Sequence, residues 1–156
     1  MLKKIIEWVT GILLVLVTGV FWGTWFALSR SMSELPPGTF IVIGKEIMQN
    51  VALTMSIIMP ASIVGLVVLL IGSWKIKSVY FYCMGAALIL FIAALIITLV
   101  VEVPIDNQIR TWTAATIPAD WENIRDRWEW FHTARTFASL VCSSFFLIGL
   151  LSKTRG

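Results

Sequence analysis

The sequence predicts an all-helical integral membrane protein in which four spanning helices form a bundle. Of its 156 residues, 58% are hydrophobic and only 13% are charged, whereas soluble domains average about 45–50% and about 25%. Four long stretches contain no Asp, Glu, Lys or Arg: 8–29, 47–74, 78–101 and 136–152. A helix of about 20 apolar residues crosses a bilayer. These observations exclude a soluble domain, a disordered chain and a disulfide scaffold.

The first spanning helix is expected over residues 6–29. Its uncharged stretch of 22 residues, 8–29, is about twice as long as the apolar part of a cleaved signal peptide. We therefore interpret this segment as an anchor that stays in the membrane. Gly19 and Gly23 share a face of the helix, and this spacing of small residues lets neighbouring helices approach closely.

The second spanning helix is expected over 47–73 and the third over 79–101. Pro60 lies inside the second helix and should kink it, because proline removes a backbone hydrogen bond. Ala61 and Gly65 provide a second pair of small residues for close packing. The link between the two helices is short, so they should run antiparallel. The simplest topology for the whole bundle is therefore up-down.

The fourth span is expected over 130–151, as part of a longer helix. No Pro or Gly occurs from Ala119 to Ile148, and Pro118 suits the first turn of a helix. A helix of roughly 30 residues is about 45 Å long, which exceeds the bilayer core. Its first part should therefore extend beyond the membrane on the outer side. The outer loop segment between the third and fourth spans covers 102–129.

Lysine and arginine are distributed unevenly over the two sides of this bundle. One side holds six of them in three short segments: Lys3, Lys4, Lys75, Lys77, Lys153 and Arg155. The other six are spread over 30–46 and 102–135. Because cytoplasmic loops are enriched in these residues, we expect both termini to face the cytoplasm of a bacterial cell, across its inner membrane. The net charge of +3 comes without a basic cluster, so no nucleic-acid partner is expected.

A polar stripe runs along the fourth helix. Its members recur at alternating steps of four and three residues: Trp121, Arg125, Trp128, His132, Arg135, Ser139 and Cys142. Such spacing places the side chains on one face. Charged groups at membrane depth normally face a bundle interior or a water-filled cavity, which favours a functional site. The alternative is an aromatic and arginine belt at the membrane interface, which requires no site.

Polar residues from the other helices should gather at the same outer end. Glu102, Asp106 and Arg110 follow one another at four-residue steps after the third span; a capped helix end with surface ion pairs is the alternative reading. We expect a pocket with aromatic walls that opens to the outer leaflet or the periplasmic side. Its predicted binding residues are Arg125, Trp128, Asp106, Trp112 and Asn50. This lining suits a flat, oxygen-bearing aromatic molecule or a lipid head group.

The sequence predicts neither a metal site nor a cofactor. A single histidine excludes a haem held by two histidines, and no His-x-x-x-His or Glu-x-x-His pair occurs. Phosphate-binding loops and dinucleotide fingerprints are also missing from the sequence. Cys83 and Cys142 lie at different depths of their spans, so a disulfide between them is not expected.

Two segments carry a resemblance to a known family. They are 103–107 (VPIDN), after the third span, and 128–135 (WEWFHTAR), before the fourth. They resemble the motifs of the anthrone oxygenase-like family of small four-helix membrane proteins. The family pattern places Asn at the position where this chain has Asp106. The chain departs from the pattern there, and this leaves the role of Asp106 open. Characterised members are similar to oxygenases that convert anthrones to anthraquinones with O2 and no evident cofactor.

The resemblance implies roles for individual residues. An anthrone loses a C–H proton to give an enolate that can pass an electron to O2, so a base is needed, and His132 is the natural candidate. Arg135 or Arg125 would stabilise the enolate oxygen. Asn107 would orient the carbonyl group, and Trp128 would stack on the ring. The substrate would be a polycyclic aromatic or quinol-like molecule.

Two other functions stay open at this point. The chain is alternatively a non-catalytic membrane protein that binds a lipid, a quinone or a partner subunit, or a small structural subunit. In each version the partner is a hydrophobic aromatic or lipid-like molecule or the membrane lipid itself. The oligomeric state does not follow from the sequence.

Overall fold

The computed structural model describes residues 1–152 and is all-helical over that range. Its long helices are α1 (Leu2–Ala27), α2 (Pro37–Ile71), α3 (Val79–Ile97) and α5 (Trp121–Ser152). A 3-10 helix, η1 (Ser29–Glu34), links α1 to α2. A π-helical turn, η2 (Thr98–Glu102), joins α3 directly to α4 (Val103–Thr111). Four helical segments, of which 79–111 is one, are long and apolar enough to span a membrane, which confirms the predicted fold class.

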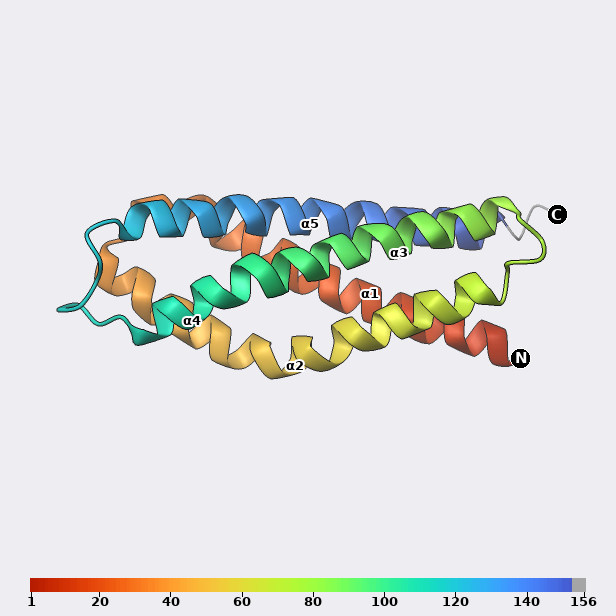
Figure 1. Cartoon of the computed structure of the whole chain (residues 1–156), viewed down its shortest axis with the longest axis horizontal. Coiled ribbons are helices and arrows are strands. Elements are labelled where there is room, and N and C mark those ends of the chain that lie inside the picture. The colour runs from red at the N-terminus through yellow and green to blue at the C-terminus, as the bar shows by residue number, and fades with distance from the viewer. Residues whose placement is uncertain (153–156) are drawn as a thin grey trace.

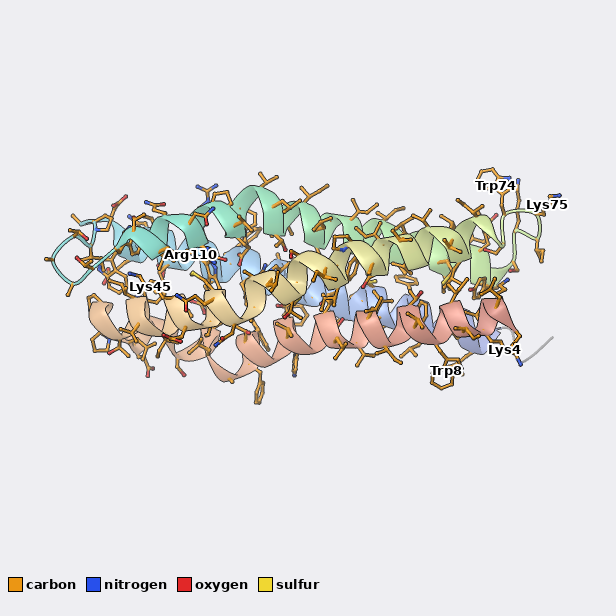
Figure 2. The ribbon with its side chains drawn as sticks, turned by 90° about the horizontal axis from the view of Figure 1, so that it is seen from below. Lys4, Trp8, Lys45, Trp74, Lys75 and Arg110 are labelled. Atoms are coloured by element: carbon orange, nitrogen blue, oxygen red, sulfur yellow. The ribbon has the colours of Figure 1, made fainter. Side chains whose placement is uncertain are left out.

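The helices form an elongated bundle in which successive helices point in opposite directions along its axis (Figure 1). Helix α5 packs along α3 and α1, and α2 packs along α1 and the α3–α4 segment. The N-terminus and the end of α5 lie at the same end of the bundle. Figure 2 places Lys4 and Lys75 at that end, with Lys45 and Arg110 towards the other. We call this other end, where η1, α4 and the start of α5 lie, the distal end.

Much of the segment expected as an outer loop, 102–129, is helical. The helix that includes α3 continues to Thr111, α5 begins at Trp121, and only 112–120 connects them without regular structure. Pro104 does not end the helix, because it occupies the first turn of α4, where its missing N–H is not needed. Helix α2 likewise begins at Pro37, again with proline in the first turn, and not at 47.

Close helix packing occurs at Gly65 and not at the first glycine pair. A Cβ atom added to Gly65 would overlap the side chain of Thr10 on α1. By contrast, nothing lies within 4 Å of a Cβ atom added at Gly19 or Gly23. The prediction of a close contact is therefore wrong for the α1 pair, because those glycines lie on an exposed face. Gly65 is the residue that lets α1 and α2 approach.

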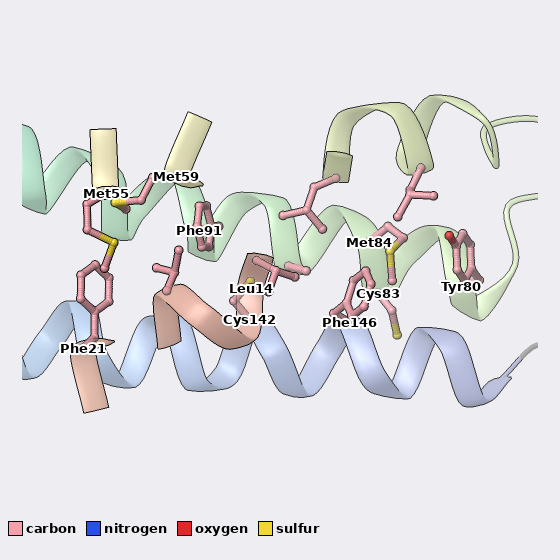
Figure 3. Packing of buried hydrophobic residues seen from close by; sticks show 14 residues of the cluster. Leu14, Phe21, Met55, Met59, Tyr80, Cys83, Met84, Phe91, Cys142 and Phe146 are labelled. Carbon is pink, nitrogen blue, oxygen red and sulfur yellow. The ribbon is translucent and has the colours of Figure 1, made fainter. Parts of the chain in front are cut away.

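The core consists of two apolar clusters along the axis. The larger cluster, part of which Figure 3 shows, contains Leu14, Met59, Phe91 and Phe146 among its buried members. A second cluster fills the distal end, with these buried residues: Met32, Phe40, Ile41, Met48, Val101, Ile105, Ile109, Trp112 and Trp128. We call it the distal cluster. Between the two clusters α2 bends away from the α3–α4 segment (Figure 1), and the candidate site lies in this region.

Candidate functional site

A cavity of about 410 Å³ lies between α2 and the α3–α4 segment, with α1 and α5 on its other sides. Most of its wall is apolar, and α2 supplies the largest share of the wall, including Gly44, Met48, Met55 and Met59. The charged residues and most of the polar residues of the wall come from η2, α4 and α5: Thr98, Asp106, Asn107, Arg110, His132 and Arg135. Pockets of roughly 300–1,000 Å³ with a few placed polar groups are typical of small-molecule sites.

Arg135 is the best-anchored charge in this wall. Its Nη2 lies 2.8 Å from Oε2 of Glu102, and its Nη1 donates a hydrogen bond to Oγ1 of Thr98 at 3.1 Å. The guanidinium also lies over the ring of Phe21, with 4.5 Å between Cζ and the ring centroid. Both charged groups are buried, and a buried charge is tolerated when it is paired. Arg135 therefore holds a fixed positive charge beside the cavity.

His132 supports Arg135 through its Nδ1 atom. Nε and Nη2 of Arg135 lie 3.2 Å and 2.8 Å from this nitrogen. Arginine can only donate hydrogen bonds, so Nδ1 accepts them and the neutral ring carries its proton on Nε2. This Nε2 has no hydrogen-bond partner among the described residues, although the Phe21 carbonyl interacts with the ring. In this arrangement the lone pair of Nδ1 accepts the hydrogen bonds from Arg135 and is not available to a substrate proton.

Trp128 contacts both the carboxylate of Asp106 and the imidazole ring of His132. Its Nε1 donates a hydrogen bond to Oδ1 of Asp106 at 3.0 Å. Its ring stacks on the imidazole of His132, with 4.8 Å between centroids and 3° between the ring planes. Asp106 therefore has a fixed orientation on α4, and its carboxylate lines the cavity together with Arg135 from α5. One wall thus presents a carboxylate and a guanidinium to the same apolar space.

Glu102 was not among the predicted site residues, yet it is essential to this geometry. Its side chain is fully buried, and neither oxygen makes a hydrogen bond within the described part of the chain. Its charge is balanced by the ion pair with Arg135. Glu102 ends the π-helical turn, and such turns shift side-chain directions and are frequent at functional sites.

The structure brings five of the eight predicted site residues to the cavity. These are His132, Arg135, Asn107, Trp128 and Asp106. The remaining three lie elsewhere, and they do so for separate physical reasons.

Arg125 is buried, but it pairs with the adjacent Asp126, at 2.9 Å from Nε and 2.8 Å from Nη2, and it lies over Trp121. Trp112 belongs to the distal cluster, where its carbonyl accepts a hydrogen bond from Nζ of Lys45 at 2.7 Å. Asn50 is exposed on α2 and is not part of the cavity wall.

The expected aromatic walls are also largely replaced by other side chains. Besides Trp128, the aromatic residues of the lining are Phe21 and Phe40, while α2 contributes mainly methionines. A signal for the α2 wall exists in the sequence. Gly44, Met48, Val51, Met55 and Met59 follow one another at steps of four, three, four and four, and helical spacing of this kind places them on one face.

No group of three His, Cys, Asp or Glu side chains that could hold a metal ion occurs within the described residues. Comparison with family models gives one match, to the anthrone oxygenase family over residues 45–145. The matched region runs from within α2 into α5 and contains Glu102, Asp106, Trp128, His132 and Arg135. The comparisons with curated proteins and with solved structures gave no match.

Proposed function

Because the chain belongs to the anthrone oxygenase family, we propose that it is a membrane oxygenase that oxidises a polycyclic aromatic or quinol-like substrate with O2. The substrate binds in the cavity between α2 and the α3–α4 segment, and no cofactor takes part. One observation carries this proposal. A carboxylate, Asp106, and a guanidinium, Arg135, line the same apolar cavity, and each is fixed by its own partners.

The first step is removal of a proton from carbon. An anthrone carries a CH2 group opposite its carbonyl group, and loss of one of these protons gives an aromatic enolate. The carboxylate of Asp106 accepts this proton, since the lone pair at Nδ1 of His132 is engaged by Arg135. The negative charge develops on the enolate oxygen, where the guanidinium of Arg135 stabilises it. Fixed charges of this kind are most effective in a site that excludes water.

The second step is the reaction with O2. The enolate passes one electron to O2, and the two radicals combine to form a C–O bond at the former CH2 carbon. The resulting peroxide anion takes back the proton from Asp106. The O–O bond of this hydroperoxide then breaks while the carbon loses its second proton, which gives a carbonyl group and water. The sum is anthrone plus O2 to anthraquinone plus H2O, so atoms and electrons balance.

The other residues of the wall position these groups. Arg135 has five N–H donors, and the contacts with His132, Thr98 and Glu102 occupy four of them. One Nη1 hydrogen is left for a substrate oxygen. Asn107 lines the same wall and supports the substrate carbonyl as a hydrogen-bond donor. The methionines of α2 contact the ring faces, because the methionine side chain adapts its shape and its sulfur interacts favourably with aromatic rings.

The test is oxygen uptake by the purified protein in lipid nanodiscs supplied with anthrone, with the rate in protein-free nanodiscs subtracted. Asp106→Asn should lower turnover by about 100-fold or more, as removal of a general base does. Binding of anthraquinone, the unreactive product, should change little. Glu46→Gln, an exposed carboxylate of α2 outside the cavity wall, is the matched control and should keep full turnover.

A second variant separates the roles of Asp106 and His132. In His132→Gln the new amide oxygen still accepts a hydrogen bond from Arg135, so a positioning role predicts a loss of only about 10-fold. If His132 is the base, His132→Gln should instead lower turnover by about 100-fold or more, which is the loss expected when a general base is removed. Full turnover in Asp106→Asn would rule out the proposed base directly.

A non-catalytic binding protein is the second candidate, and the largely apolar cavity wall favours it. Such a protein would hold a quinone or a lipid in the same space. A native mass spectrum of gently purified protein, followed by organic extraction, identifies what it retains. A bound quinone or lipid together with oxygen uptake no faster than the protein-free rate would replace the oxygenase by a carrier.

A further inference from the structure

The cavity is closed at the distal end, where the bundle would meet water. Four side chains of the distal cluster that stand there are at most 3% exposed: Met32, Phe40, Ile109 and Trp112. Partly buried Ile117 and Trp121 pack against the same cluster. The hydrogen bond from Lys45 to the Trp112 carbonyl ties the chain after α4 to α2. A ligand that entered along the bundle axis at this end would have to open the distal cluster.

Along its side, by contrast, the cavity reaches the surface of the bundle. Seven residues both line the cavity and are exposed, and two of them, Asn107 and Arg110 of α4, lie towards the distal end. The other five are Ala52, Ser56 and Pro60 on α2, with Leu99 and Val103 on the facing segment. Leu99 is 57% exposed and Val103 is 38% exposed. The α2 side of the gap has small residues, Ala52 and Ser56, which leave room between the helices. We call the gap between these five residues the side opening.

The surface around the side opening is apolar. Leu53, Ile57 and Val100 surround it and are all strongly exposed. The opening also falls within two stretches that carry no charged residue, 47–74 and 78–101, apart from Val103 at its distal edge. Segments of this kind lie in the hydrocarbon region of a bilayer. The side opening therefore faces lipid chains, and the exposed polar residues Asn107 and Arg110 mark the edge of the cavity beyond it.

We propose that the side opening is an entry port, through which a lipophilic polycyclic ligand passes from the bilayer into the cavity. The anthrone-like identity of that ligand rests on the proposed function, whereas the route rests on the geometry of the cavity alone. The ligand passes between Ala52 and Ser56 on one side and Leu99 on the other. It then reaches the polar wall at Asp106 and Arg135 without crossing an aqueous phase. The product, which is equally apolar, leaves by the same route.

The test measures binding rates with 1,8-dihydroxyanthraquinone, whose own fluorescence reports its transfer into the protein in lipid nanodiscs. Ala52→Trp and Ser56→Trp should narrow the port. They should slow association and dissociation together, by about 10-fold or more, while Kd stays nearly constant, because both directions cross the same barrier. The matched controls are Leu53→Trp and Ile57→Trp, whose side chains are exposed outside the cavity wall and should leave both rates unchanged.

Two further variants keep the proposal falsifiable if a tryptophan disturbs folding. Leu99→Ala widens the port and should raise both rates. Ile117→Ala loosens the distal cluster without touching the cavity lining and should leave them unchanged. If Ile117→Ala accelerates binding while the port variants match their controls, entry is through the distal end and the proposal fails.

Turnover and binding also separate this proposal from the proposed function. If the port variants change the binding rates of the probe but the protein does not oxidise anthrone, the entry port stands and the oxygenase proposal fails. If anthrone turnover is normal and no port variant changes the binding rates, the oxygenase proposal stands and the entry port fails. A protein that does not bind the probe at all overturns both.

Discussion

At the scale of single residues, the candidate site depends on how the charge of a buried arginine is balanced. Arg135 lies among apolar side chains, and its countercharge is Glu102, which is itself fully buried. Taking two charges out of water is costly, and the cost is offset only while both partners are present. His132 and Thr98 add hydrogen bonds to the same guanidinium. Removing one partner should therefore affect stability as well as chemistry.

Glu102→Gln should lower the free energy of unfolding by about 3–5 kcal/mol, because it leaves Arg135 buried without a countercharge. Thermal and denaturant unfolding in detergent would measure this change. The double variant Glu102→Leu with Arg135→Leu should recover much of the stability, since it removes both charges, while oxygen uptake stays lost. A single variant as stable as the unchanged protein would show that the ion pair does not hold the site together.

Part of the cavity wall follows from the sequence, and the reason is helical periodicity. Trp128, His132 and Arg135 recur at steps of four and three, which places them on one face regardless of their partners. The partners themselves depend on tertiary structure. Arg125 belongs to the same stripe, yet its neighbour Asp126 satisfies it. Likewise, no local pattern reveals that Nδ1 of His132 accepts hydrogen bonds from Arg135.

At the scale of helices, charge-free stretches identify the spanning segments but not the helix ends. Such a stretch indicates which residues lie in hydrocarbon, and a helix can continue beyond it with charged residues. Residues 103–111 and 121–129 illustrate this, because they are helical although they contain most of the charges of the predicted outer segment. The π-helical turn before Pro104 also escapes prediction, since nothing in its sequence TLVVE distinguishes it from an ordinary helical turn.

Gly65→Ala should destabilise the contact between α1 and α2. The added methyl group overlaps the Thr10 side chain, and forcing a group into a packed site typically costs about 1–3 kcal/mol. Unfolding in detergent would detect the loss. Gly19→Ala is the control, because nothing lies within 4 Å of its added Cβ, and it should change stability by less than about 0.5 kcal/mol. Equal stability of both variants would contradict the packing described for Gly65.

At the scale of the whole molecule, the two halves of the bundle differ in what they contain. The end with the N-terminus is packed around the larger apolar cluster (Figure 3), whereas the distal half holds the cavity and the buried charges. Four spanning helices place both ends of the chain on one side of a membrane. The distribution of Lys and Arg predicts that this side is the cytoplasm.

Reporter fusions test this orientation. Green fluorescent protein after residue 156 should fluoresce, and alkaline phosphatase at the same position should be inactive, because its disulfides do not form in the cytoplasm. Alkaline phosphatase inserted in the connection 112–120 should be active. The opposite pattern would place the distal end in the cytoplasm and reverse the predicted topology.

The most direct measurement of the central claim is a reaction with ¹⁸O2. The purified protein in nanodiscs is supplied with anthrone, and the rate and isotopic content of the anthraquinone are followed by mass spectrometry. The account predicts that product with one ¹⁸O atom in its new carbonyl group forms much faster than in protein-free nanodiscs, and that Asp106→Asn returns the rate to near that background. Product that forms no faster with the protein than without it would contradict the account.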